Sequence, residues 1–192
     1  MSINLRNALM SGKRLPYDAE VEFLESTGTQ WIDTGLNYFA DFEVGIKLRT
    51  SVPNKALGTG ISMCLQRYSA NNPYWDLQIS GRSYRSSASI VDYHVMSWKG
   101  GVFAADGVTV YTVSNPFASG TMMLFGVGGQ PYPNMIYTCK LWDANGTLVR
   151  DFIPVRKGTV GYLYDRVSGK LFGNAGTGAF GYGNDLPYPI PA

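Results

Sequence analysis

Three acidic residues near the start of the chain, Glu20, Glu22 and Glu25, have the residue type and the close spacing that glycoside hydrolysis uses. Hydrolysis with retention needs two carboxyl groups about 5 Å apart, one of which is kept protonated by burial. In an extended segment Glu20 and Glu22 share one face, and Glu25 reaches that face only where a bulge re-aims it. We therefore expect the acids to form the solvated face of a strand near a sheet edge. No catalytic residue is assigned, and an enzyme is not expected.

The other residue types that support catalysis or cofactor binding are isolated in the sequence. His94 is the single histidine, and we expect it packed or on a strand surface rather than in a metal site or a catalytic triad. The run GNAGTGAFGYG (173–183) lacks the Gly-Lys-Ser/Thr of a phosphate loop, so its glycines are expected in tight turns and close strand contacts. Loop acids such as Asp106 and Asp185 could contact calcium, but no acidic cluster resembles a ligand set. No metal and no cofactor is therefore predicted.

The overall composition limits the classes of partner. The chain has 192 residues, of which 45% are hydrophobic, and this is enough for one well-buried core. Charged residues make up 16% and the net charge is +2, so neither nucleic acid nor an anionic membrane is an expected partner. Cys64 and Cys139 lie in apolar alternating segments and are expected to be buried free thiols. The first residues contain no secretory hydrophobic region, so we expect cytosolic synthesis without a signal peptide and without membrane insertion.

Short alternating segments dominate the middle of the chain. In DFEVGIKLR every second residue from Phe42 to Leu48 is apolar, which predicts a half-buried strand. Similar segments recur up to residue 172 and are separated by turn sequences such as Ala-Asp-Gly (105–107) and Ala-Asn-Gly (144–146). Many short strands at this spacing predict an all-β fold, a two-sheet antiparallel sandwich.

Both ends of the chain differ from this pattern. The start holds a small apolar group, Ile3, Leu5, Leu9 and Met10, followed by a flexible link, SGKR. A helix this short is marginal in water, so we interpret the group as an attachment arm that a partner covers. The last nine residues hold three prolines and are expected to be extended. The expected division is an arm (1–18), a sandwich domain (19–183) and an extended tail (184–192).

Aromatic and basic side chains are concentrated in the segment RYSANNPYWDLQISGRSYRSS (67–87). Flat rings next to guanidinium groups are what a sugar ring or a protein partner would contact. Another ring lies in the loop GGQPYPN. The alternative for all of these rings is ordinary packing inside the sandwich. The expected ligand or partner surface consists of Tyr74, Trp75, Arg82, Tyr84 and Tyr132.

Two stretches at the ends of the domain carry a resemblance to a known group of proteins. VEFLESTGTQWIDTGL (21–36) and the block from MIYTCKLWD to GAFGYG (135–183) resemble concanavalin A-like, laminin-G-like jelly-roll domains that are common in bacteriophages of gut bacteria. HVMSWKGGVFAADGVTVYTVSNPFASGTMMLFG (94–126) is similar to the central strands of that group. The arm and residues 51–92 have no counterpart. The resemblance implies a jelly roll whose first and last strands lie side by side.

The same resemblance implies a function. It points to a phage virion structural protein, displayed on the capsid or tail surface as a decoration, head fibre or adhesion protein, that is assembled in the host cytoplasm. The expected partners are capsid, neck or tail proteins bound through the arm, sister subunits in a homo-oligomer such as a trimer, and a host-surface glycan. Two alternatives stay open. The first is a carbohydrate-binding adhesion module, and the second is a sandwich glycoside hydrolase, whose catalytic strand has an acid pattern close to that of Glu20, Glu22 and Glu25.

Overall fold

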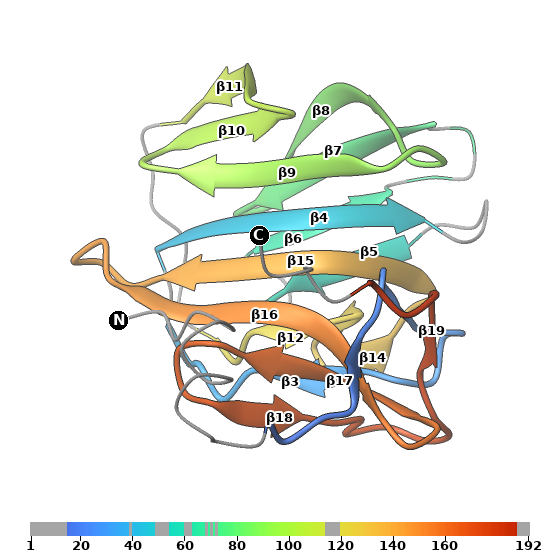
Figure 1. The fold of residues 1–192 in the computed structure, drawn as a ribbon. Helices are drawn as coiled ribbons and strands as arrows, with labels where there is room; N and C mark the ends of the chain where they lie inside the picture. The colour runs from blue at the N-terminus through green and yellow to red at the C-terminus, as the bar shows by residue number, and fades with distance from the viewer. Residues whose placement is uncertain are drawn as a thin grey trace.

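The described residues of the chain form β-strands connected by turns. The computed structural model describes residues 15–38, 40–48, 54–59, 63–67, 69, 71, 73–113 and 120–187, and within these ranges it contains no helix. Two antiparallel sheets pack face to face, which confirms the expected all-β sandwich (Figure 1). The apolar group of the expected arm, Ile3, Leu5, Leu9 and Met10, lies outside the described residues.

The larger sheet, called here the large sheet, has eleven strands among the described residues, and its main path runs β11-β10-β9-β4-β15-β16-β17-β18. Its strands are β1 (Ala19–Glu20), β2 (Leu24–Glu25), β4 (Asp41–Leu48), β9 (His94–Lys99), β10 (Val102–Ala105), β11 (Val108–Thr112), β15 (Asn134–Trp142), β16 (Leu148–Lys157), β17 (Val160–Asp165), β18 (Lys170–Phe172) and β19 (Gly181–Tyr182). Figure 1 looks onto the outer face of this sheet.

The small sheet lies behind the large one in Figure 1 and follows the order β3-β12-β5-β6-β7-β8. Its strands are β3 (Ile32–Asp33), β5 (Asn54–Gly58), β6 (Met63–Arg67), β7 (Tyr74–Ile79), β8 (Arg82–Ser89) and β12 (Met123–Leu124). A separate hairpin follows β12 and consists of β13 (Gly126–Val127) and β14 (Gln130–Pro131). In the described part of the chain no helix could span a bilayer.

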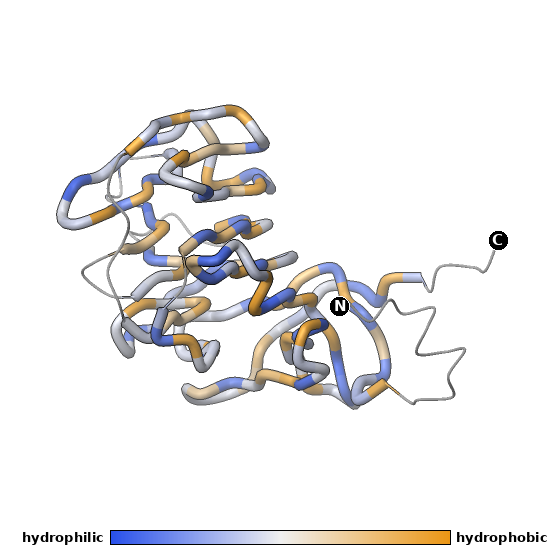
Figure 2. Tube along the Cα trace, turned by 90° about the vertical axis from the view of Figure 1, so that its left-hand side faces the viewer, coloured by the Kyte–Doolittle hydropathy of each residue, from blue (hydrophilic) through white to orange (hydrophobic). Residues whose placement is uncertain are grey.

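One hydrophobic core fills the space between the two sheets. The alternation expected for β4 is confirmed, because Phe42, Val44, Ile46 and Leu48 are all buried. Hydrophilic and hydrophobic residues alternate along many of the strands in Figure 2, as they must when one face of a sheet is buried and the other is solvated. Both cysteines are buried free thiols, as expected, and burial raises the pKa of Cys64 to about 11.

The turns between strands have the chemistry that the sequence indicates. In the β10–β11 hairpin Asp106 and Gly107 both have positive φ, 51° and 78°, which is the backbone that a two-residue hairpin with right-handed strand twist needs. The glycine-rich run near the C-terminus serves close approach, as expected. A Cβ on Gly176 would lie 2.1 Å from the backbone oxygen of Thr29, so only glycine fits there.

The beginning and the end of the domain lie side by side, as the sequence resemblance implies. Strand β2 pairs with β19, and Val21 forms a bridge with Asp185. The packed region also extends past the expected limits of 19–183. Tyr17 is buried in a small second cluster with Ile153, Val155 and Tyr164, and the amide of Leu186 donates to the carbonyl oxygen of Glu20.

Strand β15 changes its partner halfway along. One edge of β15 pairs with β4 over its whole length. The other edge pairs first with β2, through Ile136 and Leu24, and then with β16, from Cys139 onward. The register with β4 shifts between Ile136 and Thr138, so Tyr137 is the extra residue of a β-bulge at the point where the sheet divides. This division sets the position of the site described below.

Candidate ligand-binding surface

The structure corrects one member of the expected surface in segment 67–87. Trp75 has no exposed surface and is among the largest fully buried side chains. It follows the period of two in β7, where Trp75, Leu77 and Ile79 all point into the core. Its neighbour Asp76 lies on the opposite face and pairs with Arg85 at 3.2 Å. Trp75 therefore stabilises the sandwich and cannot contact a ligand.

The remaining residues of that segment do not form one surface. Tyr84 is half-buried, packs against the core, and meets Tyr111 with ring centroids 5.3 Å apart. This pair lies where the edge strands β8 and β11 approach each other. Tyr74 is 38% exposed at the start of β7, whereas Arg82 is exposed as the first residue of β8, at the other end of that hairpin.

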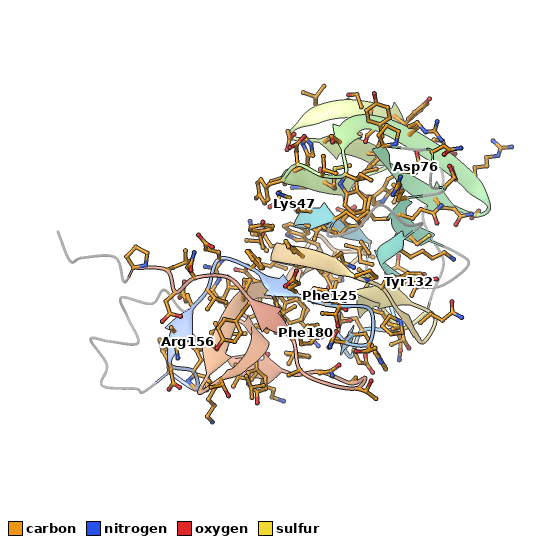
Figure 3. All side chains as sticks on the ribbon, turned by 90° about the vertical axis from the view of Figure 1, so that its right-hand side faces the viewer. Lys47, Asp76, Phe125, Tyr132, Arg156 and Phe180 are labelled. Carbon is orange, nitrogen blue, oxygen red and sulfur yellow. The ribbon has the colours of Figure 1, made fainter. Side chains whose placement is uncertain are left out.

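Tyr132 follows the small hairpin β13–β14 and is half-buried. Its hydroxyl donates to Oε1 of Gln130 at 3.2 Å, and its amide donates to the carbonyl oxygen of Phe125 at 2.7 Å. Phe125 has a φ of 64°, which is a strained conformation for a bulky residue, and its ring packs on Phe180 in the interior (Figure 3). Figure 3 shows Tyr132 and Asp76 on the side of the sandwich opposite to Lys47.

The three acids at the start of the domain are divided between two pairings of the sheet. Glu20 pairs with Val155 of β16 and accepts a hydrogen bond from the hydroxyl of Tyr17 at 3.1 Å. Glu25 pairs with Met135 of β15, and the exposed Glu22 accepts hydrogen bonds from the backbone and side-chain nitrogens of Asn184. The expectation that these acids do not catalyse hydrolysis stays a prediction.

His94 lies at the start of β9 and is held by the β10–β11 turn. Its Nδ1 lies 2.6 Å from Oδ2 of Asp106, whose Oδ1 accepts the amide of Val95 at 2.8 Å. Partial burial acts to raise the pKa of Asp106, but the bonds from Val95 and His94 outweigh it and hold that pKa below the usual 3.8. Across the described ranges no group of three or more His, Cys, Asp or Glu residues is placed to hold a metal ion.

The structure brings together three aromatic rings that are far apart in the sequence, and we call them the aromatic row: Phe23, Tyr137 and Tyr93. Tyr93 and Tyr137 have ring centroids 4.8 Å apart at an interplanar angle of 74°, and Tyr137 and Phe23 follow at 5.4 Å and 56°. The rings come from the residue before β2, from the bulge in β15, and from the turn before β9. Tyr93 is 48% exposed, and the other two rings are half-buried.

A glycine in the central strand makes room for this row. Gly45 of β4 pairs with Thr138 on one side and with Val95 on the other. A Cβ at Gly45 would lie 2.8 Å from Oη of Tyr93 and 2.9 Å from Oγ1 of Thr138. The Tyr93 ring therefore rests directly on the backbone of β4, on the outer face of the large sheet. A glycine inside a strand commonly marks such a close approach.

Polar groups of both signs surround the aromatic row. Partial burial raises the pKa of Tyr93, and the negative charges of Asp106 and Glu43 raise it further. Partial burial also raises the pKa of Tyr137, and electrostatic interactions with Glu22, Tyr93 and Glu25 raise it further. On the same face Lys140 pairs with Glu43 at 3.0 Å, and Lys47 lies opposite Met135. Among the described residues, neither tyrosine hydroxyl has a hydrogen-bond partner.

Sequence reasoning missed the aromatic row because its rings are contributed by three separate segments. Two signals were present in the sequence. Gly45 interrupts an otherwise alternating strand, and Ile136 and Cys139 are both apolar although three positions separate them, which breaks the period of two and indicates a bulge. Neither signal identifies the strand that would bring Tyr93 across to Tyr137.

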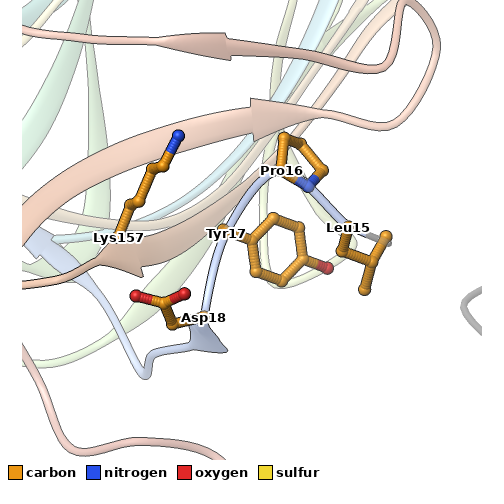
Figure 4. A pocket seen from close by; sticks show the side chains of 5 residues that line it. All are labelled: Leu15, Pro16, Tyr17, Asp18 and Lys157. Carbon is orange, nitrogen blue, oxygen red and sulfur yellow. The ribbon is translucent and has the colours of Figure 1, made fainter. Parts of the chain in front are cut away.

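A shallow pocket of about 350 Å³ lies elsewhere, at the first described residues (Figure 4). Its lining consists of Leu15, Pro16, Tyr17, Asp18 and Lys157. The carboxylate of Asp18 accepts the amide of Gly158 at 2.6 Å and so takes part in the packing of the domain start on β16. The pocket offers one cation and no row of rings.

Comparison with known proteins gives a fold neighbour and no family. No protein-family model and no curated protein matches the chain. A solved structure that is similar to it is that of a "putative carbohydrate binding protein" from Bacteroides ovatus ATCC 8483, with a TM-score of 0.58 and 16% sequence identity. The match covers 92% of this chain and 62% of that protein, so the chain spans about three fifths of its length. At this identity the likeness shows the sandwich fold alone.

Proposed function

We propose that the protein is a carbohydrate-binding module and that the outer face of the large sheet, at the aromatic row, holds the sugar. The observation that carries the proposal is the solvent-facing group of Phe23, Tyr93 and Tyr137, seated on the backbone at Gly45. Sugar rings present C–H groups that stack on aromatic faces and hydroxyl groups that need polar partners. The row offers both, because carboxylates and ammonium groups lie around the rings.

The fold neighbour supports this assignment over the virion role. That protein is described as a "putative carbohydrate binding protein", and it shares the sandwich over nearly the whole of this chain. Because one fold can serve many functions, the likeness in fold supports the proposal only together with the geometry of the aromatic row. A module of this kind needs no catalytic pair, and the division of Glu20 and Glu25 between different strand pairings is consistent with that.

A matched pair of variants tests the proposal. Tyr93 and Tyr111 are 48% and 47% exposed, and each packs against one other tyrosine, at 4.8 Å and 5.3 Å. After a glycan array has identified ligands, titration calorimetry should show that Tyr93→Ala weakens binding about tenfold, since an aromatic contact contributes up to about 1.4 kcal/mol. Tyr111→Ala should bind like the wild type. Equal losses in both variants, or a loss in Tyr111→Ala alone, would move the site away from the row.

Display on a phage particle is the second candidate and rests on the sequence resemblance at 21–36 and 135–183. In that case the module would be a decoration, fibre or adhesion protein, and the arm would anchor it to other virion proteins or to sister subunits. Removal of residues 1–14, which leaves Leu15 packed on the buried cluster of Tyr17, should then leave the melting temperature unchanged and abolish incorporation into particles or oligomer formation. Normal assembly of the shortened protein would exclude the arm as the anchor.

A further inference from the structure

The shape and the charge of the aromatic row restrict the class of glycan that it accepts, given the proposed carbohydrate-binding function. The three rings do not lie in one plane, because successive rings are turned by 74° and 56°. A flat polysaccharide surface can stack on several rings at once only when those rings are coplanar. The row instead presents differently oriented faces to successive sugar units. This geometry suits a single chain that twists from one unit to the next.

The charges around the row are predominantly negative. Four carboxylates act on the two tyrosines: Glu22 and Glu25 on Tyr137, and Glu43 and Asp106 on Tyr93. Two ammonium groups, those of Lys47 and Lys140, lie on the same face, and His94 adjoins it through Asp106. Leaving His94 aside, these four carboxylates and two ammonium groups of described residues sum to a charge of −2. Lys140 is also held by Glu43, so its charge is partly compensated before any ligand arrives.

These carboxylates favour the binding of neutral sugars over that of acidic sugars. A neutral sugar offers hydroxyl donors, and a hydrogen bond from a donor to a carboxylate is stronger than one between neutral groups. A uronic acid or a sulfated sugar would place a second negative charge near these carboxylates, which outnumber the ammonium groups of Lys47 and Lys140 among the described residues named above. The hydroxyls of Tyr93 and Tyr137 can bond to either kind of sugar and do not discriminate.

We propose that the aromatic row binds neutral glycans as single, soluble chains and rejects acidic ones, and that Glu22 and Glu25 are specificity-determining residues. Glu22 is fixed for this role by Asn184, which donates to its Oε2 from the backbone at 3.2 Å and from the side chain at 3.3 Å. Gly183 makes this arrangement possible, because a Cβ there would lie 2.8 Å from Cβ of Glu22 and 2.9 Å from the ring of Phe23. The end of the domain therefore positions both an acid and a ring of the site.

The test uses one polymer in two charge states. A soluble neutral glycan that binds in the array is treated so that its primary alcohols become carboxylates, and the two forms are titrated side by side. At low ionic strength we expect the oxidised form to bind about tenfold more weakly, because two protein carboxylates oppose each new charge. As salt is added, the affinity for the oxidised form should rise toward the affinity for the neutral form, since ions screen exposed charges. Neutral binding itself should change little with salt.

The double variant Glu22→Gln/Glu25→Gln separates repulsion from the loss of a sugar hydroxyl. If the carboxylates set the specificity, the variant should bind the oxidised polymer several-fold more tightly than the wild-type protein does.

The proposal would be overturned if the weaker binding of the oxidised polymer responded neither to salt nor to these substitutions. Equal or tighter binding of the oxidised polymer would overturn it as well. Depletion of the protein by the microcrystalline form of the same polymer would overturn the single-chain part. In each of these cases the protein still binds a glycan. Absence of binding to every glycan would instead refute the proposed function itself.

Discussion

The protein carries two groups of aromatic and charged side chains, and they differ in what brings them together. In segment 67–87 the residues are neighbours in sequence, yet the strand period of two sends Trp75 into the core and Asp76 to the opposite face. In the aromatic row the residues are separated by up to 114 positions, yet strand pairing places Phe23, Tyr93 and Tyr137 within contact distance. In a β-sandwich, side chains that are neighbours in sequence are therefore sent to opposite faces of a strand by alternation. Side chains that are distant in sequence are brought together by the pairing register of the strands.

The largest expected difference between the two regions is in stability. Trp75→Ala removes a large, fully buried side chain, so the free energy of unfolding should fall by about 3–5 kcal/mol through lost transfer energy and cavity formation. For a domain of this size this corresponds to a decrease of roughly 6–20 °C in melting temperature. Thermal unfolding followed by circular dichroism measures it, with Tyr93→Ala as the exposed control. A decrease of only one or two degrees would show that Trp75 is at the surface after all.

The second expected effect concerns the contact between the Tyr93 ring and the backbone of Gly45. Gly45→Ala places a methyl group 2.8 Å from the Tyr93 hydroxyl oxygen, which is too close, so the ring must move away from β4. Tyr93 is 48% exposed and can move at low cost, so stability should change by less than about 1 kcal/mol. Glycan affinity should fall about as far as in Tyr93→Ala, roughly tenfold. Unchanged affinity in Gly45→Ala, measured by the same titration, would mean that the position of Tyr93 does not matter for binding.

A smaller effect is expected in acid at the edge of the row. The folded-state pKa of Asp106 lies below 3.8, so its contribution to stability is present above pH 3.8 and is lost as the pH falls through the lowered value. The carboxylate side chain is 50% exposed and screened, so this contribution should be below about 1 kcal/mol. Asp106→Asn keeps a residue that tolerates positive φ and should remove this part of the acid dependence of the melting temperature. An identical pH profile in the variant would contradict the assignment.

The smallest effect is expected at the exposed end of segment 67–87. Arg82 is the exposed first residue of β8, so Arg82→Ala should change both the melting temperature and the glycan affinity by amounts close to the measurement error. A loss of glycan affinity in this variant, with the fold intact, would restore segment 67–87 as the ligand surface and would remove the distinction between the two regions.

Much of the fold follows from local sequence, because it depends on alternation and turn chemistry. The buried face of β4, the Asp106-Gly107 hairpin and the burial of both cysteines are of this kind. The burial of Trp75 could also have been read from its spacing to Leu77 and Ile79, but the concentration of rings and guanidinium groups around it suggested a surface. The expected surface residue Tyr84 turns inward for the same reason, since it pairs with Leu77.

The aromatic row is a different case, because no local rule contains it. Phe23, Gly45, Tyr93 and Tyr137 meet only after β4 has been paired with β9 and β15, and β15 has been paired with β2. Long-range pairing of this kind depends on which strands fold next to each other, and a single sequence records it weakly. The break in alternation at Ile136 and Cys139 indicates a bulge without indicating its neighbours.

The central claim is that a glycan lies on the outer face of the large sheet, and chemical-shift mapping tests it most directly. The isotope-labelled protein is titrated with a neutral oligosaccharide from the array, and backbone amide shifts are followed. The largest changes are predicted at Phe23, Gly45, Tyr93 and Tyr137, with the amides of β7 and β8 nearly unmoved. The claim would be contradicted if the chemical-shift changes were concentrated at Tyr74, Arg82, Tyr84 and Tyr132 and the amides of the aromatic row did not shift.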